Sequence, residues 1–223
     1  MSIDPSRSLA ELVLERPAHA PVLERLGLDF CCGGKRSLAE ACADRGLDPE
    51  TVIVFLESEL EPSASETTDW TAASLADLCA HIVEAHHGRL RWELPRIGEL
   101  AEKSLAAHGA ERPELEEVRE VFEALRAELE EHIEDEEARL FPLLVSGEVP
   151  GPETLAELEH EHDDAGAALR RLRELTGGYD RGRALCSTHL ALLDGLHGLE
   201  LDLHQHVHEE NNVLFPRARA LAA

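Results

Sequence analysis

The chain has 223 residues, with 46 acidic against 21 basic side chains, so its formal net charge is −25. This length suits one large domain, or a small domain joined to a larger one, and it is enough to bury a core without disulfides. A charge this negative argues strongly against nucleic acid or an anionic membrane as a partner bound through a basic patch. The sequence contains neither an apolar run of membrane-spanning length nor a signal-peptide pattern, so we expect a cytoplasmic protein.

The composition predicts an all-α protein. Leu, Ala, Glu and Arg dominate, and aromatic residues make up only 4%. Residues 1–60 are expected to form a small helical domain, punctuated by Gly and Pro. Its predicted helices are Ser8–Leu14, Ala18–Leu26, Ser37–Arg45 and Pro49–Leu60. Residues 61–69 are polar, unpatterned and contain a proline, which is typical of a linker.

Residues 70–223 are expected to form a four-helix bundle. Four long helical patterns are separated by short Gly- and Pro-containing breaks, and such helices fold up and down with sites built from inward-facing side chains. The predicted helices are Ser74–Ala107, Pro113–Leu144, Pro152–Thr176 and Arg183–Ala220.

A repeated motif within the bundle predicts a metal site. The pattern H-x3-E-x3-L-F-P occurs at His132 to Pro142 and again at His206 to Pro216. Residues four apart lie on the same face of a helix, so each histidine and its glutamate can reach one site. Twelve of the 13 histidines lie after residue 80, and this excess also points to metal.

The two remaining long helices each supply a histidine at a similar distance before the motif, His87 and His162. Six ligands are too many for one ion with open positions, but they suit two ions bridged by two carboxylates. Mixed imidazole and carboxylate ligands favour iron over zinc or manganese. The predicted metal ligands are His87, His132, Glu136, His162, His206 and Glu210.

Other assignments compete with this ligand set. His204 and His208 form another pair four residues apart, on a different face. Glu84-x-x-His87 and Glu159-x-x-His162 match the spacing of ferritin-like di-iron bundles, but that alternative leaves the repeated His132 and His206 without a role. The remaining nearby histidines, His81, His86 and His160, are expected to be outer neighbours of the site or solvated.

Glu128 lies one turn before His132, and Glu161 precedes His162. Both carboxylates are candidates for a supporting or proton-handling role beside the metal. Solvated glutamate is the alternative for each.

The five cysteines are expected to be free thiols in a reducing compartment. Cys31 and Cys32 are adjacent, directly before two glycines and a predicted helix start with Lys35 and Arg36. Positive side chains and a helix N-terminus lower a thiol pKa, so the pair is a candidate for reactive thiols, with a packed, unreactive loop as the alternative. The other three, Cys42, Cys79 and Cys186, fall in predicted helices and are expected in the core.

The sequence resembles the di-iron family that repairs iron–sulfur clusters, the repair of iron centres proteins. The resemblance covers nearly the whole chain. It is carried by the Leu26–Lys35 segment with its Cys-Cys-Gly-Gly run, by the two H-x3-E-x3-L-F-P motifs, and by Glu161 to Gly166. In that family an aromatic residue usually precedes the first histidine, whereas this chain has His86 there, and the spacing to Leu94-Pro95 favours His87 as the ligand.

The resemblance implies a hemerythrin-like bundle with a non-haem di-iron centre, and a function in restoring iron–sulfur clusters damaged by nitric oxide or oxidants. Damaged iron–sulfur proteins would be its clients, by iron donation, and a homodimer is one assembly to consider. The residues four away from His162 are Leu158 and Gly166, which counts against the oxygen carriage of hemerythrins. Reduction of nitric oxide, or sensing of nitric oxide or oxygen, needs the same site with open coordination, so the sequence does not decide whether the protein is an enzyme.

Overall fold

The computed structural model describes residues 3–58 and 69–221. These residues are almost entirely helical and contain no strand, which confirms the predicted all-α class. Nearly all of the predicted linker 61–69, and the end of the helix predicted to reach Leu60, lie outside the described residues. A search of the described helices found none with both the length and the apolar character needed to span a membrane.

The N-terminal part is a cluster of short helices around its own apolar core. Ser8 and Ser37 each cap a helix start. The serine hydroxyl accepts from the N–H of a glutamate three residues on, and the serine N–H donates to the carboxylate of that glutamate, a pattern that is visible in the sequence. Leu12, Leu23 and Leu56 are fully buried in the core that these helices share. The elements are α1 Leu9–Glu15, the 3₁₀ turn η1 Pro17–His19, α2 Ala20–Arg25, α3 Leu38–Arg45 and α4 Pro49–Ser58.

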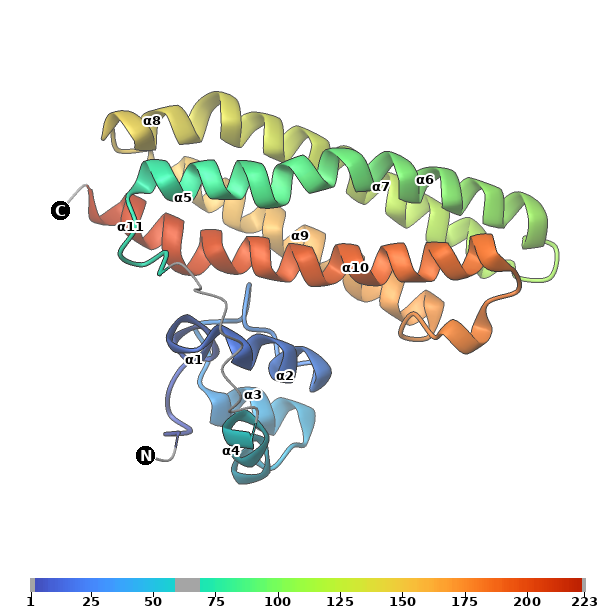
Figure 1. The fold of residues 1–223 in the computed structure, drawn as a ribbon, viewed down its shortest axis with the longest axis horizontal. Helices are drawn as coiled ribbons and strands as arrows, with labels where there is room; N and C mark the ends of the chain where they lie inside the picture. The colour runs from blue at the N-terminus through green and yellow to red at the C-terminus, as the bar shows by residue number, and fades with distance from the viewer. Residues whose placement is uncertain (1–2, 59–68, 222–223) are drawn as a thin grey trace.

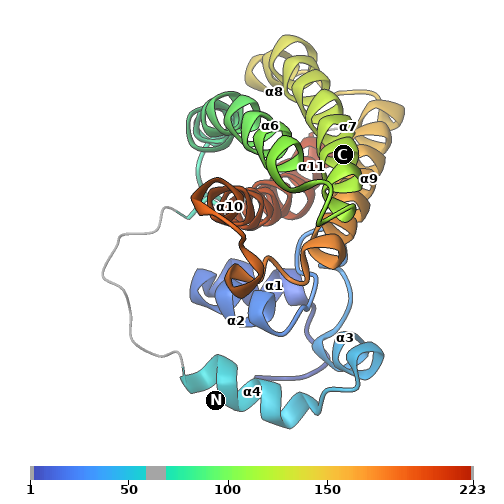
Figure 2. The ribbon, with the colours of Figure 1, turned by 90° about the vertical axis from the view of Figure 1, so that its right-hand side faces the viewer.

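The C-terminal part is an up-and-down bundle of four long helical rods, seen side-on in Figure 1 and nearly end-on in Figure 2. Three of the rods change helical register along their length, so each is a chain of segments. The first rod is α5 Leu75–Ile82, η2 Val83–His87 and α6 Gly88–His108; the second is α7 Glu114–Asp135, η3 Glu136–Leu140 and α8 Phe141–Ser146; the third is α9 Pro152–Thr176; the fourth, after the 3₁₀ turn η4 Arg181–Arg183, is α10 Ser187–Glu209, η5 Glu210–Leu214 and α11 Phe215–Ala220.

The segments η2, η3 and η5 are single π-helical turns, in which a backbone N–H donates to the carbonyl five residues before it. The N–H of Phe141 donates to the carbonyl of Glu136, and the N–H of Phe215 donates to that of Glu210. After η3 and η5 a proline stands two residues beyond the turn, and proline has no N–H and crowds the preceding turn, which a wider turn relieves. Such turns concentrate at functional sites. Each of these three π-turns begins or ends at a predicted metal ligand.

The bundle core is divided by a polar layer. One apolar cluster, including Leu90, Leu129 and Leu203, fills the α6 end of the rods. A second cluster, including Leu140 and Leu214, fills the α8 end. The predicted ligands lie between the two clusters on every rod, so apolar side chains enclose the polar layer on both sides.

The small domain lies against α10 and α9, with α1 and α2 nearest to the bundle in Figure 2. Asn212 on η5 donates from Nδ2 to the carbonyl of Cys31 at 3.1 Å, and the ring of His208 contacts the carbonyl of Phe30 at 3.2 Å. A side chain at Gly34 would place its Cβ only 2.4 Å from the carbonyl oxygen of Phe30, so this close approach requires glycine. The Cys-Cys-Gly-Gly loop is therefore clamped onto the fourth rod.

Candidate metal centre

Four histidines, one from each rod, bring their Nε2 atoms together in the polar layer. The Nε2 atoms of His87 and His206 lie 3.3 Å apart, and those of His132 and His162 lie 3.1 Å apart. All four side chains are buried. They form two facing pairs, one from the first and fourth rods and one from the second and third.

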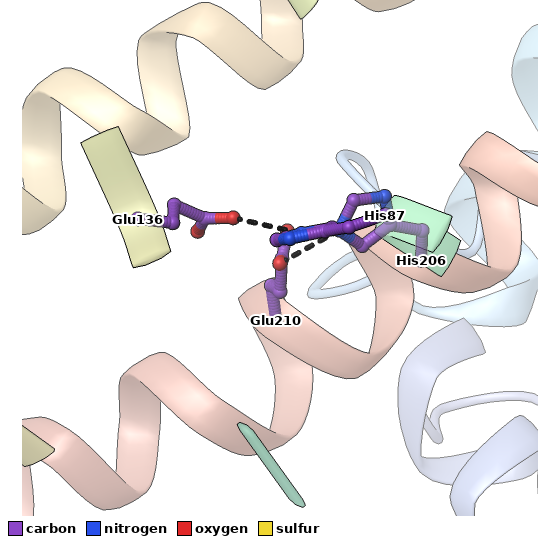
Figure 3. Close-up of side chains that lie close together, drawn as sticks. All are labelled: His87, Glu136, His206 and Glu210. Atoms are coloured by element: carbon purple, nitrogen blue, oxygen red, sulfur yellow. Dashed lines mark hydrogen bonds and ion pairs between the residues drawn. The ribbon is translucent and has the colours of Figure 1, made fainter. Parts of the chain in front are cut away.

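Two buried glutamates connect the pairs. Glu210 places Oε1 2.8 Å from Nε2 of His206 and Oε2 3.1 Å from Nε2 of His162. Glu136 places Oε2 3.4 Å from Nε2 of His87 and 3.6 Å from Nε2 of His132. Each carboxylate therefore touches one histidine of each pair, the position expected of a bridging ligand. Figure 3 shows His87, His206 and the two glutamates converging.

The buried carboxylate of Glu136 is suited to binding a cation. This side chain is completely buried, and within the described residues neither of its oxygens has a hydrogen-bond partner. Burying a carboxylate in this way is costly unless a positive charge completes it. Imidazole with carboxylate is a donor set that binds iron well, so the chemistry of the residues fits the implied metal.

Outer acceptors fix the orientation of three of the histidine rings. Nδ1 of His87 lies 2.8 Å from Oε1 of Glu137, and Nδ1 of His132 lies 2.6 Å from Oε2 of Glu161. Nδ1 of His162 lies 2.9 Å from Oδ1 of Asn211. A ring that donates from Nδ1 presents the lone pair of Nε2, which is how proteins hold metal-binding histidines.

Charges at the centre are strongly coupled. Burial disfavours the charged form of His132, but Glu136 and Glu161 outweigh burial and raise its pKa to about 9. Burial likewise opposes ionisation of Glu210, yet the charge of His206 and the hydrogen bond from His162 hold the pKa of Glu210 well below its usual value. Metal binding would displace protons from these imidazoles and is therefore favoured by rising pH.

A pocket of about 170 Å³ leads from the surface to the centre. His132, His162 and His206 line it, together with apolar residues such as Leu129 and Val207. Glu128 and Glu161 are both exposed and both line it. Glu161 bonds His132 directly, whereas Glu128 contributes only to the lining.

The loop with Cys31 and Cys32 lies beside the third rod. The thiol of Cys32 points to the carbonyl oxygen of His162 at 3.6 Å, so the sequence-distant loop does reach a predicted ligand. The two sulfurs are 3.9 Å apart, and Cys31 also donates to Asp29 at 3.2 Å.

The prediction that Lys35, Arg36 and a helix start lower the thiol pKa is wrong for Cys31. The hydrogen bond with Cys32, burial and the charge of Asp29 raise the pKa of Cys31 well above its ordinary value. Helix α3 begins only at Leu38, and Arg36 pairs with Asp44. Lys35 pairs with Glu159 at 3.6 Å, so both positive side chains are engaged by other carboxylates.

The competing ligand assignments do not converge on the centre. Nδ1 of His204 pairs with Glu24 of the small domain at 2.9 Å, and His208 holds the Phe30 carbonyl as described above. Glu84 is exposed, and Glu159 pairs with Arg219 at 2.7 Å. His86 stacks on His206, with ring centroids 5.0 Å apart, and its neighbour His87 is the residue that points inward.

Cys186 differs from the expectation of a core position. It is half-buried at the start of α10, where its sulfur accepts from the N–H of His189 at 3.5 Å and contacts Nε2 of His108 at 3.1 Å. Cys42 and Cys79 are buried, in agreement with the expectation.

The sequence reasoning missed Glu137 and Asn211, the acceptors for His87 and His162. A signal was present, since both follow directly after the repeated glutamates Glu136 and Glu210. A hydrogen-bond acceptor at the same place in both copies of a metal motif indicates support for a ligand on a neighbouring rod.

Comparison with known proteins agrees with this arrangement. Residues 79–218 match the hemerythrin HHE cation binding domain, and residues 5–60 match the ScdA_N domain, a domain of unknown function. The chain is 36% identical over 213 residues to the iron–sulfur cluster repair protein YtfE of Pectobacterium carotovorum, covering 95% of this chain and 96% of that protein. The YtfE protein of Edwardsiella ictaluri is 39% identical over 218 residues, with the same coverage.

The chain belongs to the YtfE family of iron–sulfur cluster repair proteins. This confirms the resemblance drawn from the sequence. The YtfE protein of Escherichia coli is also similar, 35% identical over 218 residues. The bundle is accordingly hemerythrin-like and metal-binding, and its His and Glu clusters are the groups that can hold the metal.

Proposed function

We propose that this protein repairs iron–sulfur clusters damaged by nitrosative or oxidative stress, by donating iron held at a di-iron centre. The observation that carries the proposal is the bridging position of Glu136 and Glu210, each touching one histidine of each pair. Bound iron would supply exchangeable coordination positions and ferrous ion for a damaged client. The proposed ligands are His87, His132, Glu136, His162, His206 and Glu210.

The chain's own residues divide the remaining tasks. Glu137, Glu161 and Asn211 orient three rings, and the apolar clusters on both sides of the layer exclude bulk water. Within the thiol pair we assign the reactive role to Cys32, because Cys31 is buried against Asp29. The five free thiols support a reducing cytoplasm as the compartment.

Repair is tested with an iron–sulfur hydratase whose cluster has been damaged by nitric oxide. Iron-loaded protein should restore hydratase activity anaerobically, and the His132→Ala, His206→Ala double variant should not. His160→Ala is a matched control, because the His160 side chain is 76% exposed. If free ferrous ion at the same concentration restores activity equally well, or if the double variant is fully active, the proposal fails.

A second candidate is a nitric oxide reductase using the same centre. The 170 Å³ pocket, with its partly apolar wall, gives a small neutral molecule a path to three of the histidines. Steady consumption of nitric oxide by the iron-loaded protein with an electron donor, without any effect on the damaged hydratase, would favour this candidate over repair.

A further inference from the structure

A second cluster of metal-ligating side chains lies beside the proposed iron centre. His81, His86 and Glu209 offer one ligand atom each, all within 4.8 Å of one another. Nε2 of His81 is 3.2 Å from Oε2 of Glu209, and Nε2 of His86 is 3.5 Å from the same oxygen. None of the three belongs to the six proposed ligands.

Two of these atoms are buried and meet in an ion pair without a hydrogen bond. The side chains of His86 and Glu209 are each 7% exposed. Nε2 of His86 and Oε2 of Glu209 find no hydrogen-bond partner anywhere in the described part of the chain. Buried polar atoms without partners destabilise a fold, and a cation between them would offset that cost.

The neighbours of the cluster aim these atoms inward. Nδ1 of His86 lies 3.3 Å from Oδ1 of Asp202, which leaves Nε2 facing Glu209. Gln205 donates to Oε1 of Glu209 at 2.9 Å, which leaves Oε2 facing the histidines. The indole of Trp70 stacks on His81 with ring centroids 4.1 Å apart. This is the same device that orients the rings of the main centre.

The cluster of His81, His86 and Glu209 lies between the first and fourth rods, and the internal repeat has no matching cluster between the second and third rods. When His87 is aligned with His162 and Glu136 with Glu210, the counterparts of the three residues are Ala156, Glu161 and Asp135. Ala156 has no donor atom, and Asp135 pairs with Arg139. Glu161 accepts a hydrogen bond from Nδ1 of His132. His86, at the equivalent position, stacks on the ring of His206 and makes no hydrogen bond with its Nδ1.

A pocket of about 380 Å³ between the small domain and the bundle reaches this cluster. Glu209 and Trp70 line it, together with the acidic Glu15 and Asp69. Carboxylates along such a wall raise the local concentration of cations. The cluster therefore has an entrance separate from the pocket that leads to the main centre.

We propose that His81, His86 and Glu209 form a further site for a divalent first-row cation, Fe²⁺ in particular. Two imidazoles and one carboxylate, with open positions, are a set that suits ferrous iron. The ring of His86 stacks on His206, so the cation would adjoin the main centre. A role in loading or releasing the donated iron rests on the proposed function, whereas the binding site itself does not.

Trp70 supplies a local readout for this site. The chain has two tryptophans, and Trp92 is 65% exposed, so Trp92→Phe leaves Trp70 as the single indole. Ferrous ion is added anaerobically to this variant with its main centre already loaded. One further ion per chain should bind at equilibrium, and most of the Trp70 fluorescence should be lost.

Two separate changes test the ligands. Glu209→Gln and His86→Phe should each abolish the quenching and the further ion, and His86→Phe keeps an aromatic ring against His206. His160→Gln, on the exposed surface, should change neither. If ferrous ion does not quench Trp70 in the Trp92→Phe protein, or if both ligand variants are quenched as strongly as that protein, the cluster is an ion-pair network and the proposal is overturned.

The same titration separates this proposal from the proposed function. Adding His132→Ala and His206→Ala should remove the tightly held iron while ferrous ion still quenches Trp70. Quenching combined with no repair of the damaged hydratase by the parent would overturn the function and leave the site standing.

Discussion

Single hydrogen-bond acceptors determine which way three histidine rings of the proposed metal centre face. Asn211 is the sharpest case, because its partner His162 and Asn211 itself are both buried, so water does not replace the bond. Losing such an outer partner typically weakens metal affinity by about 10–100-fold.

We therefore expect Asn211→Leu to lower the ferrous affinity of the main centre by about 10-fold or more. Leucine is close to asparagine in size but offers no acceptor to Nδ1 of His162. Competition with a calibrated chelator under anaerobic conditions measures the affinity. Asn211→Asp keeps the acceptor and should stay near the parent value; an unchanged affinity in Asn211→Leu would contradict the orienting role.

Cys186 is expected to be an unusually acidic thiol. The N–H of His189 and the ring of His108 lower its pKa to about 7. Its alkylation by iodoacetamide, followed by peptide mass spectrometry, should therefore rise steeply through about pH 7 and level off above it. His108→Gln should move that midpoint upward, and a midpoint near the ordinary thiol value in the parent would contradict the prediction.

Residue by residue, the repeat predicted which side chains converge in the polar layer, because side chains four residues apart on a helix share one face; their role as metal ligands stays a prediction. The repeat brought out His132, Glu136, His206 and Glu210 together. It did not reveal the separate His81 cluster, since that cluster joins residues of the first and fourth rods without any repeat. The sequence also did not predict that Cys186 lies half-buried at the start of α10, because the first residue of that helix depends on where the preceding turn ends.

At the level of elements, the helices were predictable and their register changes were not. Serine caps and glycine breaks are local signals, so α9 matches its predicted bounds, Pro152–Thr176. The π-turns η3 and η5 depend on a balance between proline crowding and packing of whole rods, and periodicity alone does not show it. The Leu-Phe-Pro end of each motif was the available clue.

The contact between η5 and the cysteine loop gives a prediction at this scale. Asn212→Ala removes the donor to the Cys31 carbonyl, so residues 28–34 should exchange their amide hydrogens faster. Protection of α4, in the same small domain but away from η5, should be unchanged, which shows that the domain remains folded. Equal exchange of the loop in parent and variant would show that Asn212 does not hold it.

Across the whole molecule, we expect acidity and stability to be linked to metal binding. The chain carries a net charge of −25, and the buried carboxylates of Glu136 and Glu210 lie at the centre of that field. The packing of Cys32 beside His162 joins residues 130 positions apart, which no local sequence pattern specifies. Such a contact depends on the shape of two finished surfaces.

Burying the Glu136 carboxylate without a metal should lower the free energy of unfolding. In metal-free protein at pH 10, above the pKa of about 9 of His132, Glu136→Gln removes a buried charge whose oxygens lack hydrogen-bond partners among the described residues, and should raise the free energy of unfolding by about 1–3 kcal/mol. Urea unfolding with and without iron measures this. The exposed Glu134→Gln should change it by less than about 0.5 kcal/mol, and a destabilised Glu136→Gln would contradict the account.

The central claim is that four histidines and two glutamates hold two iron ions. Anomalous diffraction at the iron edge, from crystals of protein purified anaerobically and desalted, tests it most directly. We predict two strong peaks, one beside the His87 and His206 pair and one beside the His132 and His162 pair, with Glu136 and Glu210 between them. A single peak at the main centre, or the absence of a peak beside either histidine pair, would contradict the account.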